Sequence, residues 1–312
     1  MTLHVVDLDG PVHHLPFTVE PSGDRAPSKE VPERVERIRA GLLDAGAALV
    51  RGSADHRPEA ERLISAVHHA EYLDYLRSPA PATAPGSLPD RFAVPGLAQD
   101  TPVTADTWPA VLSAAAAAVV AAEVTSGQGV HSYAVIRPPG HHAGRAWHGG
   151  YCFVNNAVVA ARALLSRGAG RVAILDIDYH LGNGTLDLVA AAPEIGFASI
   201  HSTDPIDFPY RFPQGAGLFG IAADPGPQVL TGHIREALAH LRAARPQALV
   251  VSVGYDILAN DPHGHWSLPP EVFSEIGRLL VAAHLPLVLI QEGGYGLPSL
   301  QAAAHALALE LK

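Results

Sequence analysis

The sequence predicts an α/β fold built on a parallel sheet, and two observations support this prediction. From about residue 130, short runs rich in valine and isoleucine alternate with longer amphipathic stretches. The short runs are continuously apolar, which is typical of strands that are buried on both faces. The stretches between them are long enough to form helices, and parallel strands need such crossover connections.

The expected elements follow from this alternation. The runs expected to form strands are Leu3–Leu8, Ala47–Val50, Tyr133–Ile136, Val172–Ile177, Phe197–Ile200, Ala248–Val253 and Leu287–Ile290. The stretches with a helical pattern are Val31–Leu43, Thr107–Ala122, Asn155–Arg167, Val229–Ala243, Pro270–Ala283 and Leu297–Leu311.

The stretch Ser78–Asp106 interrupts the pattern with six prolines and little periodicity. One interpretation is a disordered linker between two domains. The other is an ordered excursion beside a functional rim, since long loops in compact domains are often functional. Neither flank has the pattern of an independent domain, which favours the second interpretation. We therefore expect a single domain, 1–312, with residues 78–106 as a loop excursion near the rim of the site.

The charge balance excludes a nucleic-acid-binding surface. The chain has 21 Lys+Arg against 31 Asp+Glu, a net charge of −10, and its lysines are Lys29 and Lys312 alone. No basic run is present that could contact a phosphate backbone. The single cysteine, Cys152, excludes an internal disulfide framework and a cysteine-based zinc cluster, and it is compatible with a reducing cytoplasm.

The sequence indicates neither a secretory signal nor a membrane span. Its start, MTLHVVDLDG, lacks the basic region and the long apolar region of a signal peptide. The longest apolar stretch, Val111–Ala122, is interrupted by Ser113 and is shorter than the ~20 residues that a membrane span needs. We expect a soluble, cytoplasmic protein with no nucleic-acid or membrane partner.

Polar and titratable residues follow four of the expected strands. The segments concerned are Arg137–His142, Asp178–His180, Gly254–Asp256 and Gln291–Gly296. The carboxyl ends of parallel strands lie at one edge of the sheet, and ligands of open α/β sheets bind there. The four segments therefore predict one functional site at this edge.

The segment from Asp176 to His180 favours a divalent-metal site. Strand alternation would place Asp176, Asp178 and His180 on one side, and buried carboxylates need cations or donors. The alternative is a solvated strand end, but the preceding run is too apolar for an edge strand. Asp178 and His180 are candidate ligands, Asp256 is a third, and water would take the open position of a catalytic site. Without a thiolate, this ligand set suits zinc and also iron(II), cobalt or manganese.

His141 and His142 follow a rigid Pro-Pro-Gly turn, and we expect their strand to neighbour the strand with the metal motif. Adjacent histidines on a loop are commonly just solvated. A metal hydrolase, however, needs a base for water and an acid for the leaving amine, and histidine suits both roles at neutral pH. Tyr295 lies in a glycine-rich turn, an ordinary strand-to-helix connection that also offers a hydroxyl to a developing oxyanion.

These residues belong to recognisable segments. RPPGHHAG, GGYCFVNNAVVAA, LDIDYHLGNGT, SVGYD followed by DPHG, and EGGYG resemble, in order, the signature blocks of the histone deacetylase superfamily. The likeness is strongest to its bacterial members, of the acetylpolyamine amidohydrolase and class II-like deacetylase types. It covers most of Tyr133–Leu311 and is looser at His68–Leu76 and Thr104–Ala114. The resemblance implies an arginase/deacetylase-like α/β domain, with a central parallel sheet of about eight strands and helices on both faces.

The resemblance also implies the members of the site. The ligands of zinc, or of iron(II) or cobalt, would be Asp178, His180 and Asp256. The ligands of a structural potassium would be Asp176, Ser199 and the backbone carbonyls of Asp178, His180 and Ile200. The residues with a part in catalysis would be His141, His142, Tyr295, Asp176 and Asn183. Among these, His142 would be the general base and acid, Asn183 would orient it, and Asp176 would lie behind His141.

The resemblance places the substrate in a tunnel. Tyr151, which follows Gly150, would form one wall, and the other would come from Phe208, Tyr210 or Phe212. In relatives the residue at the place of His263 lines the tunnel mouth, although a solvated loop histidine is the alternative. His263 supplies no fixed negative charge, and its protonated form should repel a polyamine below about pH 6.5.

The sequence departs from the family pattern in three places. Leu181 stands where most relatives have a second histidine, a position that binds no metal in the family. Ser202–Gly220 and Ser78–Asp106 are short compared with the polyamine enzymes, in which the second region builds the dimer. The shortness of these two segments weakens the case for acetylpolyamines as substrates. A homodimer is possible on this sequence.

We therefore expect a metal-dependent amidohydrolase that removes acetyl groups from N-acetylated amines. The substrate would be acetyl-lysine, an acetylpolyamine or a small acetylated metabolite. One alternative is an arginase-type ureohydrolase, but that chemistry needs an Asp-x-His-x-Asp cluster for two metals. The other is a non-catalytic acyl-amide binding module, which would be expected to lose the base or the tyrosine.

Overall fold

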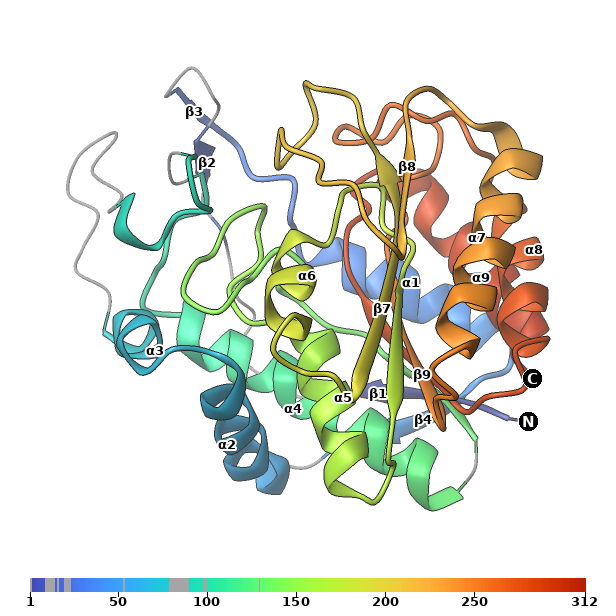
Figure 1. The fold of residues 1–312 in the computed structure, drawn as a ribbon, viewed down its shortest axis with the longest axis horizontal. Helices are drawn as coiled ribbons and strands as arrows, with labels where there is room; N and C mark the ends of the chain where they lie inside the picture. The colour runs from blue at the N-terminus through green and yellow to red at the C-terminus, as the bar shows by residue number, and fades with distance from the viewer. Residues whose placement is uncertain are drawn as a thin grey trace.

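The centre of the computed structural model is an eight-stranded parallel sheet with the order β4-β1-β5-β10-β9-β6-β7-β8 (Figure 1). The structure describes residues 2–8, 15, 17–19, 24–52, 54–78, 90–97, 100–128 and 130–312. The strands are β1 (Leu3–Asp7), β4 (Ala48–Arg51), β5 (His131–Ala134), β6 (Val172–Asp176), β7 (Ile195–Ser202), β8 (Leu218–Ile221), β9 (Ala248–Val253) and β10 (Leu287–Gln291).

Helices cover both faces of this sheet. Their bounds are α1 (Glu33–Asp44), α2 (Arg57–Val67), α3 (Ala70–Arg77), α4 (Thr107–Gln128), α5 (Asn156–Ser166), α6 (Asn183–Val189), α7 (Gly226–Arg242), α8 (Val272–Val281) and α9 (Leu297–Glu310). A short hairpin of β2 (Thr18–Val19) and β3 (Arg25–Ala26) lies outside the main sheet. In Figure 1, α1, α7, α8 and α9 lie on one side of the sheet and α2 to α6 on the other.

Each face of the sheet has its own hydrophobic core, because successive side chains of a strand point to opposite faces. In β6, Val172 and Ile174 pack in the core under α2 to α6, whereas Ala173 and Leu175 pack in the core under α1, α7, α8 and α9. All five residues of β6 are buried. The continuous apolar runs seen in the sequence follow from this double burial, and the predicted fold class is confirmed.

Several elements were not expected from the sequence, and some lengths differ from the prediction. The strand expected at Phe197–Ile200 is β7, which extends beyond this run at both ends. β8 is half exposed at the edge of the sheet, and α2, α3 and α6 were not expected as helices. α4 extends well beyond the predicted end at Ala122. Its segment Thr107–Gly127 is long and apolar enough to cross a membrane, but most of this segment is buried inside the structure. This helix packs against α2 and α5 as a core helix does.

The sheet order brings the four polar segments together. β5, β10, β9 and β6 are adjacent central strands, so their carboxyl ends meet at the middle of one edge. The expectation that the strand before His141 neighbours the metal-motif strand is wrong, because β10 and β9 separate β5 from β6. The tandem histidines instead reach the cluster through the long connection between β5 and α5. Of the excursion 78–106, residues 79–89 and 98–99 lie outside the described residues.

Candidate functional site

Asp178, His180 and Asp256 form a compact group just beyond the ends of β6 and β9. One ligand atom from each lies within 4.8 Å of the others, and both carboxylates are fully buried. The strand alternation expected for residues 176–180 is wrong, because β6 ends at Asp176. The convergence comes from the turn that follows, in which the backbone N–H of Tyr179 donates to Asp256 Oδ1 at 3.1 Å.

The charges of this group depend on one another. Burial, and after it the charge of Asp178, raises the pKa of Asp256 to about 7. Burial opposes a charged His180, but its hydrogen bonds with Asp178 and Asp256 raise its pKa to about 10. Burial also opposes ionisation of Asp178, yet His141 and His180 hold its pKa below the usual range. Two buried carboxylates therefore require a positive charge between them.

This donor set fits a divalent cation. Two carboxylates and one imidazole supply three oxygen and nitrogen ligands, which leaves an open coordination position of the kind found in catalytic metal sites. Gly293 permits the close packing: its backbone N–H donates to Asp178 Oδ2 at 2.8 Å, and a Cβ there would collide with both carboxylates. Leu181, which stands where the resemblance implies a histidine, is buried, and the three ligands lie together beside it.

The tandem histidines have different partners. His141 Nδ1 lies 3.0 Å from Asp176 Oδ2, and His142 Nδ1 lies 2.7 Å from Asn183 Oδ1. Burial disfavours a charged His141, but Asp178 and Asp176 raise its pKa well above the usual value. Burial, together with His141 and His180, lowers the pKa of His142 well below the usual value. The arrangement therefore favours a neutral His142 whose Nδ1–H donates to Asn183 and whose Nε2 is a free base.

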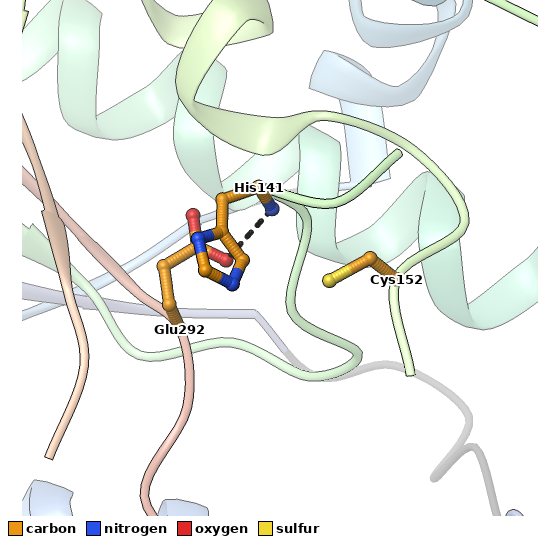
Figure 2. A group of neighbouring side chains, drawn as sticks. All are labelled: His141, Cys152 and Glu292. Carbon is orange, nitrogen blue, oxygen red and sulfur yellow. Dashed lines mark hydrogen bonds between the residues drawn. The ribbon is translucent and has the colours of Figure 1, made fainter. Parts of the chain in front are cut away.

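Glu292 anchors the turn that carries both histidines, and the sequence analysis missed this role. Its Oε2 accepts from the backbone N–H groups of Gly140 and His141 at 2.7 and 3.1 Å, and its Oε1 accepts from Ser252 at 2.9 Å. Figure 2 shows Glu292 beside His141, with the backbone hydrogen bond dashed. Its position in the EGGYG segment is the signal that could have indicated it.

Cys152 completes a second group of ligand atoms with His141 and Glu292 (Figure 2). Burial raises the pKa of the Cys152 thiol well above its usual value, so the sulfur stays protonated. The thiol lies 3.4 Å from the carbonyl of Gly150, and Glu292 is occupied by the donors described above. We therefore interpret Cys152 and Glu292 as residues that pack around His141 and position it, and not as metal ligands.

Tyr295 is held by two buried residues that the sequence analysis also missed. The carboxylate of Asp261 accepts from the backbone N–H groups of Tyr295 and Gly296 at 2.6 and 2.9 Å. The guanidinium of Arg34 lies 4.4 Å from the centre of the Tyr295 ring, and its Nε donates to the carbonyl of Gly294 at 2.5 Å. Burial raises the pKa of Tyr295 well above its usual value, so its hydroxyl remains a donor.

The cluster lies at the inner end of a pocket of about 610 Å³. Gly150, Tyr151 and Phe208 line it, and the Phe208 ring meets the His142 ring edge-on at 4.6 Å. Tyr210 lines the outer part, whereas Phe212 stacks on His201 instead. Of the three aromatic residues proposed for the second wall, the geometry thus favours Phe208.

His263 lies in the pocket, half-buried, with its Nε2 3.1 Å from the hydroxyl of Tyr151. Its ring also packs edge-on against the ring of Tyr295 at 4.8 Å. Burial, aided by His180, Arg34 and Lys29, lowers the pKa of His263 to about 4. This lowered pKa runs against the expectation that the histidine becomes charged below about pH 6.5, because burial disfavours the charged form.

The residues expected to bind potassium lie behind the site. Asp176 and Ser199 are register partners on β6 and β7, and both side chains are fully buried. Asp176 Oδ1 accepts from the backbone N–H of Asp178 at 3.1 Å. The hydroxyl of Ser199 lies 3.0 Å from His201 Nδ1, and Ile200 is buried beside it.

Comparisons with known proteins find relatives of this chain over most of its length. The histone deacetylase domain model matches residues 28–311. The chain is 33% identical over 311 residues to an acetylpolyamine amidohydrolase of Mycoplana ramosa, covering 89% of this chain and 90% of that one. It is also 33% identical to acetylpolyamine amidohydrolase 1 of Pseudomonas aeruginosa over 313 residues, with the same coverage.

A solved structure confirms the fold. The crystal structure of an acetylpolyamine aminohydrolase from Burkholderia pseudomallei matches with a TM-score of 0.81 and 28% identity, covering 98% of this chain and 97% of that one. The arginase/deacetylase-like architecture expected from the sequence is thereby confirmed. The chain belongs to the histone deacetylase family.

Proposed function

We propose that this protein is a zinc-dependent deacetylase that hydrolyses N-acetylated amines to acetate and a free amine. The observation that carries the proposal is the convergence of Asp178, His180 and Asp256 with His142 and Tyr295 around one pocket. The names of the relatives support an acetylated amine as substrate. Iron(II) and cobalt remain alternative ions for the same three ligands.

The chain's own residues supply binding, proton transfer and charge stabilisation. A divalent ion held by the three ligands would act as a Lewis acid toward the acetyl carbonyl and toward water. His142 Nε2 takes a proton from the attacking water and returns it to the nitrogen of the departing amine. Asn183 holds the tautomer that this transfer needs, because its Oδ1 accepts from Nδ1. The hydroxyl of Tyr295 donates to the oxygen of the tetrahedral intermediate.

The remaining expectations are kept as proposals. Structural potassium would be held by Asp176 and Ser199 with the carbonyls of Asp178, His180 and Ile200, and the register pairing of Asp176 with Ser199 supports this. We propose that 1–312 acts as one catalytic domain, since Gly96, Leu97 and Asp100 of the excursion line the pocket. The cytoplasmic location, the homodimer and the lack of nucleic-acid and membrane partners stay predictions.

Metal removal and restoration test the proposal. Dialysis against a chelator should abolish acetate release from an acetyl-lysine substrate, and zinc, iron(II) or cobalt should each be added back separately. We expect acetate release to recover when the protein contains close to one ion per chain, as determined by elemental analysis. Full activity in the metal-free protein would contradict the proposal. Two tightly bound transition ions per chain would instead favour the arginase-type ureohydrolase.

A further inference from the structure

The outer end of the pocket is charged differently from its inner end. The inner end holds the buried carboxylates of Asp178 and Asp256. The lining also contains the exposed residues Gly96 and Arg211, which belong to the solvent end of the pocket. The charge at the solvent end of the pocket therefore affects which group a substrate can carry at the end opposite its acetyl group.

The side chain of Arg211 lies beside a glycine at the outer end of the pocket. Its Nη1, Nη2 and Cζ atoms lie 3.0, 3.1 and 3.2 Å from the position that a Cβ on Gly96 would take. Gly96 has a φ of +82°, which disfavours any other residue there. The guanidinium therefore lies in the space that a side chain on Gly96 would fill, and both residues line the pocket.

The charge of Arg211 is not neutralised by the described part of the chain. None of the ion pairs and hydrogen bonds of the described residues includes its guanidinium. Asp100 also lines the pocket, but its carboxylate already has partners. It accepts from the backbone N–H of Gly150 at 2.8 Å and from the hydroxyl of Thr101 at 2.9 Å. The guanidinium is thus available to a ligand.

Resting on the proposed deacetylase function, we infer that the pocket selects N-acetylated amines whose far end carries a carboxylate, which Arg211 binds. A guanidinium forms two parallel hydrogen bonds with a carboxylate, a geometry that a neutral or cationic end cannot reproduce. An acetylated ω-amino acid or an amino acid acetylated on its side chain has this arrangement. The ammonium of an acetylpolyamine would instead be repelled by Arg211.

Three acetamides on the same five-carbon stem test the inference. They end in a carboxylate (6-acetamidohexanoate), a carboxamide (6-acetamidohexanamide) and an ammonium (N-acetyl-1,5-diaminopentane). We expect kcat/KM to fall in that order, by about fivefold to tenfold per step, the range for charges about 4 Å apart near water. The effect should lie mainly in KM and should weaken with salt.

Arg211→Gln should bring the carboxylate and carboxamide substrates to the same kcat/KM, and Arg211→Glu should favour the ammonium substrate. Arg235→Gln is the matched control, because it removes an exposed arginine on α7 outside the pocket lining. Its substrate order should equal that of the unmodified protein. An unchanged order in Arg211→Gln would overturn the inference, as would an ammonium substrate that is the best of the three.

Binding separates this failure from failure of the proposed function. If none of the three compounds is hydrolysed, the deacetylase proposal is contradicted, and calorimetric binding of the same compounds then decides the role of Arg211. Tighter binding of the carboxylate, lost in Arg211→Gln, would still support an anionic ligand. Equal binding of all three compounds would overturn the inference that Arg211 binds a carboxylate.

Discussion

The hydroxyl of Tyr295 is the smallest group whose removal tests the chemistry. Tyr295→Phe keeps the ring that packs on Arg34 and His263 and deletes only the donor to the oxyanion. We expect kcat to fall by about 10²–10³-fold with KM largely kept. Steady-state kinetics on a neutral acetyl-lysine amide measures this. Tyr75→Phe, on α3, is the matched control, and an undiminished rate in Tyr295→Phe would mean that this tyrosine is only structural.

The ligand residues should link activity to metal content. Asp178→Asn or His180→Ala changes one ligand of the group, and His180→Ala also removes the imidazole whose Nδ1 lies 3.1 Å from Asp256 Oδ2. We expect activity and bound metal to be lost together, as determined by acetate release and elemental analysis of the same preparation. His284→Ala, an exposed histidine after α8, should change neither. Retention of the metal by both ligand variants would remove Asp178 and His180 from the site.

His263, which lies beside Tyr151 in the pocket, provides a test of how the pocket discriminates between charged and neutral substrates. His263→Glu should shift preference toward acetylated polyamines, because a cation about 4 Å from the new carboxylate gains about 1–4 kcal/mol at effective dielectrics of 80 to 20. The measurement is the ratio of kcat/KM for acetylputrescine to that for a neutral acetyl-lysine amide. An unchanged ratio would show that the substrate does not approach His263.

The pH dependence of the unmodified protein follows from the same residue. Because the pKa of His263 is lowered to about 4, the residue stays neutral well below its usual value of about 6.5. The selectivity ratio should therefore stay constant from about pH 8 to about pH 5. A clear loss of acetylpolyamine turnover centred near pH 6.5 would show that His263 is solvated.

At the scale of elements, the loop between β5 and α5 depends on a neutral histidine. His68 Nδ1 lies 2.8 Å from the carbonyl of Gly144, and the backbone N–H of Asn155 donates to His68 Nε2 at 3.1 Å. Burial lowers the pKa of His68 to about 4. Protonation would destroy the acceptor at Nε2, so this residue ties Gly144 and Asn155 of the histidine-bearing loop to the C-terminal end of α2 only while it is uncharged.

The resulting stability should be lost in acid. A histidine with a lowered folded-state pKa contributes fully above its unfolded pKa of about 6.5, and the contribution falls as the pH decreases toward about 4, by up to about 3 kcal/mol. Urea unfolding of the protein and of His68→Gln across this range measures it. The variant should be less stable near neutral pH and should show a weaker pH dependence. Parallel curves would contradict the assignment.

At the scale of the whole molecule, the sequence predicted the buried centre better than the edges. β9 has the bounds that its apolar run indicated, because both of its faces are buried. β8 is half exposed and α6 is short, so neither has a continuous run or a full helical period. The ligand triad was predictable because each member directly follows a strand.

The supporting contacts were not predictable in the same way. Arg34 lies 260 residues from Gly294 in the chain, and Glu292 lies 152 residues from Gly140. Such pairs can be identified only when the order of the strands is known, and in that order two strands separate β5 from β6. Local patterns indicate which residues carry the chemistry, whereas the residues that position them depend on the complete fold.

Acetate release from a neutral N-acetyl-lysine amide by the zinc-loaded protein is the most direct test of the central claim. We expect one acetate per amine released, with the rate abolished in Asp178→Asn and lowered by about 10²–10³-fold in Tyr295→Phe. Binding of the amide without any release of acetate would contradict it, and would favour a non-catalytic acyl-amide binding module.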